Sequence, residues 1–440
     1  MAVRTAAEIF ALRATLETYL NVESALASTQ ADLGMVPSQS AAEIARHATL
    51  AALQLDGLQE QTERTGYPIA PLVRQLTTAC GEHGRWIHWG ATTQDVLNTA
   101  LALQVNECWV GFGEALLQLI NRLSELTEEH RHSLMVARTF GGHALPITFG
   151  FKTAVWLSAL LRHAERLEGL RKRRMPGEFA GVAGTLASLE SRGLDVRRQL
   201  MKRLDLPESS ITWSAMRDCV IERLAALANL TATLAKITQD VAELSSTEIG
   251  EVAEHGSDSS DASSALPYKA NPMHCAQASA SATLVAQYAD AALLAVRQHQ
   301  ERSGEGLLEY QVVPLAFVQT ERCIQKTQGV LNGLKVFPAR MRSNVGLTGG
   351  IILAERYMMA LGPHLGRLAA HDLVHEACGE AIALDLDLAD ALAMNPKVTQ
   401  YLDHKTIHSL SDPETYLGGV HSMIDSVLAD SLAFRASLGQ

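Results

Sequence analysis

Three segments of the chain gather side chains that can hold an anion or move a proton. They are residues 88–95, 138–143 and 256–272, and each interrupts a helical pattern with small and polar residues. Together they offer hydroxyl, amide, imidazole and ammonium groups. Polar loops on a rigid scaffold carry function more often than the elements they connect. One such segment alone is equally compatible with a connecting loop and with a functional site, but three of them predict a binding or catalytic site.

The elements that must position these segments are long helices. Residues 208–249, 42 in all, contain neither Gly nor Pro, and six apolar residues recur there at alternating steps of three and four. This heptad seam consists of Leu227, Leu230, Leu234, Ile237, Val241 and Leu244. A helix over the whole stretch would be about 60 Å long. Residues 273–303 and 151–167 predict further helices, and strand signals are nearly absent. The sequence therefore predicts an all-α bundle.

Charge and composition narrow the class of protein. The 440 residues carry 37 Lys and Arg against 48 Asp and Glu, a net charge of −11, and 47% of them are apolar. This acidic balance argues against nucleic acid as a partner, and no apolar run is long enough to span a membrane. The six cysteines show no Cys-x-x-Cys spacing, and the N-terminus lacks a signal-peptide pattern. We therefore expect a cytoplasmic protein with reduced thiols, and its long seams favour a homo-oligomer over a monomeric bundle.

The third segment includes residues 263–272, Ser-Ser-Ala-Leu-Pro-Tyr-Lys-Ala-Asn-Pro, which resemble the signature loop of the fumarase/aspartase superfamily. Residues 88–95 resemble that superfamily's His-x-Gly-x-Thr-Ser-Gln-Asp region, and residues 181–185 resemble its Gly-x-x-Gly-Thr turn. Residues 344–350 and 366–378 fit the branch of adenylosuccinate lyase and 3-carboxy-cis,cis-muconate cycloisomerase. The resemblance covers nearly the whole chain, with the motifs in the family's order.

The resemblance implies three helical regions and an oligomer. The regions are an N-terminal helical domain at 1–110, a central long-helix bundle at 111–362 that carries the signature loop, and a C-terminal helical domain at 363–440. In such families the central bundle forms a homotetramer, and three subunits assemble each active site. The resemblance also implies a small polycarboxylate substrate, with no cofactor and no metal.

Members of this superfamily remove a proton next to a carboxylate and break or make a C–N or C–O bond at the β position. The resulting charge spreads into an aci-carboxylate, which fixed cations and donors stabilise. The resemblance assigns the base to Ser263, which Lys269 and the exclusion of water must activate; the structural alternative is a helix cap. His88 and His143 are the other catalytic candidates. The residues expected to bind the substrate are Thr92, Thr93, Gln94, Arg138, Thr139, Ser264, Lys269 and Asn271.

Within the branch, the residues of segment 138–143 distinguish two possible reactions. Adenylosuccinate lyases carry Arg-Thr-His-Gly-Gln there, with the histidine as general acid, whereas this chain has Phe140 at that place. An amine that leaves as an anion needs a proton donor, but a carboxylate is a weak base and needs none. Phe140 therefore favours a lactone-forming reaction like that of the cycloisomerase.

Two alternatives stay open. A lyase that releases fumarate from an N-substituted aspartate remains, because His88 or His143 could donate the proton, or the amine could leave as ammonium. A helical scaffold without turnover is the other alternative. It follows from Ala262 and Ala270, which replace a glycine and an arginine of the signature loop.

Overall fold

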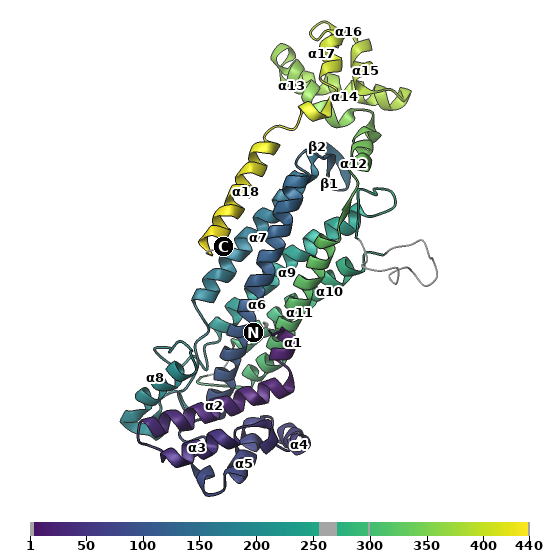
Figure 1. Ribbon diagram of the computed structural model, residues 1–440. Coiled ribbons are helices and arrows are strands. Elements are labelled where there is room, and N and C mark those ends of the chain that lie inside the picture. Colours follow the sequence, from purple (N-terminus) through teal and green to yellow (C-terminus); the bar gives the residue numbers. More distant parts are fainter. Residues whose placement is uncertain (1–3, 255–270, 298–299, 439–440) are drawn as a thin grey trace. The chain divides into compact units, whose positions relative to one another are not determined.

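The computed structural model describes residues 4–254, 271–297 and 300–438 (Figure 1). Contacts group these residues into two compact units. Unit 1 takes the described residues of Met1–Leu116, His163–Ala235 and Ala278–Gln325, and unit 2 takes those of Leu117–Arg162, Lys236–Gln277 and Lys326–Gln440. Each unit joins segments that are distant in the chain, so this grouping does not test the three consecutive regions, which remain a prediction.

Long helices dominate the described chain and confirm the predicted all-α class. They are α6 (Thr93–Glu129), α7 (Phe149–Lys172), α9 (Asp218–Leu244), α10 (Met273–Ala295) and α11 (Leu307–Asn332). The six seam residues of α9 are buried, none of them more than 4% exposed, as the heptad pattern predicts. Among the helices within the described ranges, none has the length and hydropathy of a membrane span.

Helix α9 is shorter than the sequence predicts. It has 27 residues, which corresponds to about 40 Å. The residues before it are held by tertiary hydrogen bonds, in which the backbone N–H of Trp213 donates to Glu178 at 3.1 Å and its indole N–H donates to the carbonyl of Gly177 at 3.2 Å. The first of these bonds uses a backbone N–H that a longer helix would need, and the second anchors the side chain outside a helix; α9 begins at Asp218. Helix α10 likewise ends at Ala295, before the predicted end at residue 303.

The shorter helices of unit 1 pack around one amphipathic helix. They are α1 (Ala6–Ile9), α2 (Leu12–Asp32), α3 (Ser38–His47), α4 (Leu55–Thr65), α5 (Ile69–Cys80) and α8 (Gly193–Arg203). Helix α2 contacts both α3 and α8, and α3 contacts α5. Leu16, Leu20 and Leu26 form the buried side of α2 together with Glu23. Helix α2 therefore holds a carboxylate inside an apolar layer.

The C-terminal helices of unit 2 share a core, except the last of them, whose Val420 and Ile424 pack in a separate cluster with Ala154 of α7. They are α12 (Pro338–Val345), α13 (Ala354–Leu365), α14 (Arg367–Leu384), α15 (Leu388–Met394), α16 (Pro396–Thr399), α17 (His404–Ser409) and α18 (Val420–Ser437). Helix α13 packs against α14, and α14 packs against α15. Tyr357, Leu361, Leu392 and Ile407 are buried in a shared cluster.

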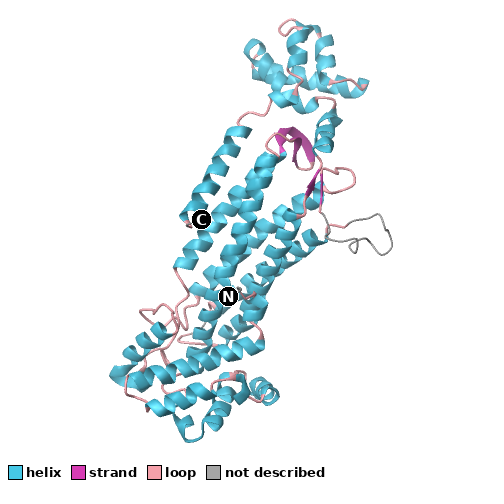
Figure 2. Cartoon of the chain, viewed as in Figure 1, coloured by secondary structure: helices cyan, strands magenta, loops and turns pink. Residues whose placement is uncertain are grey.

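Unit 2 also contains the strands, shown in magenta in Figure 2. Strand β1 (Leu134–Thr139) pairs antiparallel with β2 (Gly142–Thr148), and β3 (Val252–Ala253) pairs antiparallel with β4 (Lys335–Val336). The segment 138–143, expected to be a loop, therefore lies mostly in a β-hairpin.

The hairpin turns at Phe140 and Gly141. Thr139 pairs with Gly142, which leaves a two-residue turn with φ angles of 51° and 83°. Two consecutive positive φ angles are typical of a type I′ turn, whose twist matches that of the strands. Sequence reasoning missed the hairpin because Phe-Gly is not one of the usual Asn-Gly or Asp-Gly signals.

Candidate active site

One buried carboxylate fixes the segment that leads into α6. The oxygens of Asp95 accept hydrogen bonds from the backbone N–H groups of Thr92, Ala180 and Gly181 at 2.9, 2.8 and 3.1 Å. Burial raises the pKa of the Asp95 carboxyl, and these three donors oppose that rise. Asp95 therefore joins two motifs, at 88–95 and 181–185, that are far apart in the sequence.

His88 pairs with a carboxylate from α2. Its Nδ1 lies 2.6 Å from Oε1 of Glu23, whose side chain is fully buried. The backbone of His88 has a φ of 59°, in the left-handed region that strains most residues. Burial alone would lower the pKa of the imidazole, but the charge and hydrogen bond of Glu23, together with the charge of Asp95, outweigh burial and raise it. Glu23 thus orients His88 and favours its protonated form.

We expect Glu23→Gln to lower the pKa of His88, because burial would then act without the opposing charge. A pair that raises the folded-state pKa stabilises the protein fully below the unfolded-state pKa, and this stabilisation is lost as the pH rises through the folded-state pKa. The melting temperature of Glu23→Gln should therefore lie furthest below that of the wild type at acidic pH. Thermal unfolding at a series of pH values measures the difference.

The matched control is Glu17→Gln, which removes an exposed carboxylate from the same helix. Its melting temperature should follow that of the wild type at every pH. A deficit of Glu23→Gln that stays the same from acidic to alkaline pH would contradict the pairing with His88.

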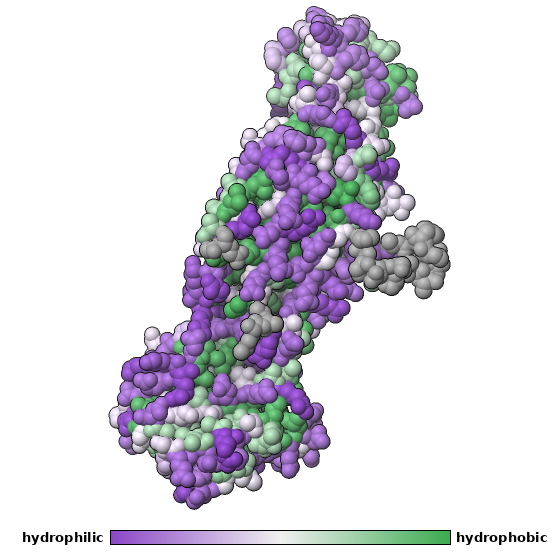
Figure 3. Space-filling view, in the orientation of Figure 1, coloured by the Kyte–Doolittle hydropathy of each residue, from purple (hydrophilic) through white to green (hydrophobic). Residues whose placement is uncertain are grey.

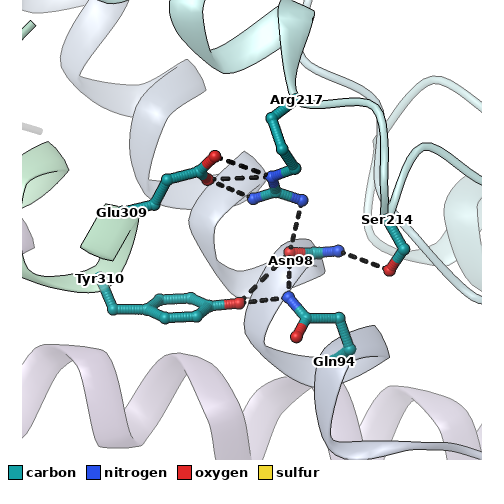
Figure 4. Close-up of polar contacts among 6 residues, drawn as sticks. All are labelled: Gln94, Asn98, Ser214, Arg217, Glu309 and Tyr310. Carbon is teal, nitrogen blue, oxygen red and sulfur yellow. Dashed lines mark hydrogen bonds and ion pairs between the residues drawn. The ribbon is translucent and has the colours of Figure 1, made fainter. Parts of the chain in front are cut away.

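A second cluster, centred on Arg217, surrounds Gln94 (Figure 4). Arg217 and Glu309 form an ion pair whose side chains are 2% and 0% exposed, with Nε of Arg217 2.9 and 3.0 Å from the two carboxylate oxygens. The guanidinium carbon lies 4.6 Å from the ring centre of Trp213. Arg217 also donates to Oδ1 of Asn98 at 3.1 Å. The ion pair therefore extends into a hydrogen-bond network.

The charge of Arg217 sets the orientation of the amides around it. A guanidinium only donates, so the atom of Asn98 that faces it must be the oxygen, and Asn98 Nδ2 then donates to Ser214 at 3.3 Å. Gln94 approaches the same oxygen with its nitrogen, which donates to Asn98 at 2.8 Å and to the hydroxyl of Tyr310. Gln94 is thus held by its nitrogen.

The network borders a cleft of unit 1. The cleft is lined by Tyr67, Gln94, Ser214, Arg302 and Tyr310, among others. Its hydroxyl, amide and guanidinium groups border a space of about 10 Å³, which is about the minimum for one water molecule. The sequence analysis selected neither Arg302 nor Tyr310, although an arginine and a tyrosine close together in the chain were an available signal.

In unit 2, a carboxylate holds Arg138. Its Nη1 and Nη2 donate to the two oxygens of Glu251 at 3.0 and 2.6 Å, and the Glu251 side chain is fully buried. Asn344 Nδ2 also donates to Glu251, at 2.8 Å. This bidentate pair neutralises the charge of Arg138. Substrate binding by Arg138 remains a prediction, and a substrate carboxylate there would share the guanidinium with Glu251.

His143 stands opposite Arg138 across the hairpin. Its Nδ1 is buried and has no hydrogen-bond partner among the residues that the structure describes. Burial and the charge of Arg138 lower the pKa of the imidazole, against the opposing charge of Glu251. His143 therefore favours the neutral form at physiological pH and is poorly suited to protonate a leaving group. Thr139, on the same strand as Arg138, is exposed.

Three expected site residues lie outside the described part of the chain: Ser263, Ser264 and Lys269. Their assigned roles stay predictions. The residues that flank this segment are described, and Glu254 accepts hydrogen bonds from the backbone N–H groups of His274 at 2.8 Å and Cys275 at 3.0 Å. Glu254 thereby caps α10, whose first N–H groups attract a carboxylate. Asn271 lies just before this cap and is half-buried.

The expected site residues thus fall into two described groups. Unit 1 holds His88, Thr92, Thr93 and Gln94, and unit 2 holds Arg138, Thr139, His143 and Asn271. Thr92 and Thr93 are half-buried at the start of α6, where the helix dipole favours an anion.

Comparisons with known proteins find relatives over nearly the whole chain. A family model described as "Lyase" matches residues 4–286, and one described as "Adenylosuccinate lyase C-terminus" matches residues 350–427. Trans-aconitate decarboxylase 1 of Mycosarcoma maydis is 38% identical over 96% of this chain and 86% of that protein. The 3-carboxy-cis,cis-muconate cycloisomerase of Acinetobacter baylyi is 34% identical over 97% of this chain and 96% of that protein. The crystal structure of a fumarate lyase from Mesorhizobium sp. BNC1 has a TM-score of 0.89 and 39% identity, and the match covers 98% of this chain and 99% of that one.

Proposed function

Because this chain belongs to the lyase family of the fumarase/aspartase superfamily, we propose that it catalyses addition or elimination at a small polycarboxylate through an aci-carboxylate intermediate. The reaction most resembles that of 3-carboxy-cis,cis-muconate cycloisomerase. Ser263 moves the proton next to the carboxylate, while Lys269, Asn271 and the backbone N–H groups near them stabilise the charge that develops. No cofactor takes part in this scheme.

The observation that carries the proposal is the residue at the tip of the β1–β2 hairpin. Phe140 is fully exposed at the first position of the turn, where the resemblance places the proton-donating histidine of adenylosuccinate lyases. A phenyl ring cannot donate a proton. His143, on the next strand, has a lowered pKa and favours the neutral form. Both features suit a carboxylate as the group that is transferred, because it leaves without protonation.

A lyase that releases fumarate from an N-substituted aspartate is the second candidate, and His88 supports it. The charge of Glu23 outweighs burial and raises the pKa of His88, so that a protonated imidazole is available to a departing amine. In this reaction His88 would take the role that Phe140 cannot fill.

The named relatives support a substrate with three carboxylates. Trans-aconitate and 3-carboxy-cis,cis-muconate, the compounds in two of those names, each carry three carboxylates and at least one carbon–carbon double bond. We therefore include an unsaturated tricarboxylate as the first substrate class to test.

We further propose a homotetramer in the cytoplasm, with active sites shared between subunits. Helix α10 buries Ala278, Val285 and Ala292 on one side, yet Leu293 and Leu294 are exposed on it. A helix that is apolar all round is normally covered. Figure 3 shows apolar patches among the polar ones on the face that it draws. Further copies of this chain are the partner that would cover them.

Ultraviolet absorbance spectroscopy separates the two reactions. With 3-carboxy-cis,cis-muconate, we expect the conjugated chromophore of the substrate to disappear as the lactone forms. With an N-substituted aspartate such as adenylosuccinate, the second candidate predicts that fumarate appears. Turnover of the N-substituted aspartate alone would overturn the first proposal, and turnover of neither compound nor of any other polycarboxylate would overturn both.

A further inference from the structure

Lys152 carries a positive charge that the described residues around it do not fully balance. It lies in the first turn of α7, directly after strand β2. Its Nζ is 3.9 Å from Oδ2 of Asp240, too far for a hydrogen bond, and its side chain is 24% exposed. The ammonium is therefore largely shielded from water, and among the described residues no carboxylate forms a hydrogen bond with it.

The carboxylate that Lys152 approaches, that of Asp240, already has two other partners. Oδ2 of Asp240 accepts a hydrogen bond from the indole N–H of Trp156 at 3.0 Å and also forms an ion pair with Lys236. Lys236, on the same helix as Asp240, makes the closer contact. Asp240 is thus shared by two ammonium groups and an indole.

The other charged pair close to Lys152 adds no net charge. Arg138 and Glu251 are bound to each other through two hydrogen bonds. With Lys152, Lys236 and Asp240, the group contains three cations and two carboxylates. Burial lowers the pKa of Lys152, and the charges of Lys236 and Arg138 add to this effect, against those of Asp240 and Glu251.

The position of Lys152 on its helix is also unfavourable for a cation. The first turn of an α-helix carries the positive end of the helix dipole, which disfavours a lysine there. The described residues around this position therefore do not explain why a lysine, with its positive charge, occurs there. A bound anion would balance both the surplus charge and the dipole.

We propose that Lys152 binds a carboxylate of the substrate, a different one from the carboxylate next to which the proton is removed. The identity of the ligand as a polycarboxylate rests on the proposed function. The guanidinium of Arg138, the cation that the sequence analysis selected in this region, is paired with Glu251, whereas the ammonium of Lys152 has no hydrogen-bonded partner in the described part of the chain. Lys152 is thereby a specificity-determining residue that favours substrates with an additional carboxylate.

Ligand-induced thermal stabilisation tests the binding role without requiring turnover. Trans-aconitate, with three carboxylates, and fumarate, with two, are added to the wild type, Lys152→Met and Lys236→Met. A ligand that binds only the folded protein raises its melting temperature. We expect Lys152→Met to weaken the binding of trans-aconitate by about 10- to 100-fold, as for loss of a charge-assisted hydrogen bond. Fumarate binding should change less.

Lys236→Met is the matched control, because it removes the other ammonium that contacts Asp240. It should bind trans-aconitate like the wild type. If Lys152→Met also binds like the wild type, or if both variants lose binding equally, the inference is overturned. Steady-state kinetics with the substrate that the wild type accepts add a second readout. We expect Lys152→Met to raise KM while kcat stays within a few-fold, because the contact persists from the ground state to the transition state.

A measurement on the unmutated protein covers the case in which Lys152→Met does not fold. Amine-selective methylation followed by peptide mass mapping should modify Lys152 in the free protein, and trans-aconitate should protect it more than it protects Lys236. Equal modification of Lys152 with and without the ligand would overturn the inference. Ligand binding that depends on Lys152, in a protein that turns over no polycarboxylate, would overturn only the proposed function.

Discussion

Ser263→Ala is expected to lower kcat by about 10²- to 10⁴-fold, the contribution typical of a positioned general base. The proton next to a carboxylate is very weakly acidic, so without the base the developing aci-carboxylate is not reached. A methyl group in place of the hydroxyl leaves the proposed cations Lys269 and Lys152 in place. KM should therefore change much less than kcat. Steady-state kinetics on the substrate that the wild type accepts measure both quantities.

The control for this variant is Ser260→Ala, which removes a hydroxyl from the same segment but outside the signature. It should keep nearly the activity of the wild type. Stabilisation of Ser263→Ala by trans-aconitate shows that the variant still binds ligand. Activity of Ser263→Ala close to that of the wild type would remove the general base from the proposed mechanism, and the helix-cap alternative would then explain the serine pair.

The largest expected effect on stability is that of Glu309→Ala. We expect the free energy of unfolding to fall by about 3–5 kcal/mol, the cost of leaving a buried charge without its partner. Arg217 is 2% exposed and cannot lose its proton, so the charge can neither reach water nor disappear. Equilibrium unfolding in urea, compared with the wild type, measures the loss.

An exposed ion pair of the same kind supplies the control. Arg4 donates two hydrogen bonds to Glu107, at 2.8 and 2.6 Å, but these side chains are 49% and 38% exposed. Glu107→Ala should cost at most about 1 kcal/mol, because water replaces the lost partner. A loss in Glu309→Ala no larger than that in Glu107→Ala would contradict the burial argument.

A double variant separates the charge from the network. Arg217→Met with Glu309→Leu removes both charges and replaces them with apolar groups, so much of the lost stability should return. The amide of Asn98 should stay unconstrained in the double variant, because the guanidinium of Arg217, which only donates hydrogen bonds, no longer faces its oxygen. Gln94 would lose the constraint that turns its nitrogen toward Asn98. Recovery of stability without recovery of ligand binding is the expected combination.

The sequence predicts residues of the candidate site, but not the side chains that the structure places against them. His88 and Gln94 lie in one short motif, and the sequence predicts both as site residues, whereas the structural role of Asp95 was not predicted. Their partners were not predictable in the same way, because Glu23 comes from α2 and is 65 positions from His88. The pKa of His88 depends on that partner, and therefore on how α2 packs.

The sequence by itself determined the helical class and the buried seam of α9, because helical periodicity is a local property of the chain. The segments that carry the chemistry stay a prediction from their motifs. Only the tertiary structure decided where α9 begins, that Phe140 turns a hairpin, that Glu251 occupies Arg138, and that Lys152 shares Asp240 with Lys236. Charge pairing and burial depend on which side chains packing brings together across many positions, as with Arg217 and Glu309, 92 positions apart. A local sequence pattern does not indicate which residues so far apart in the chain are in contact.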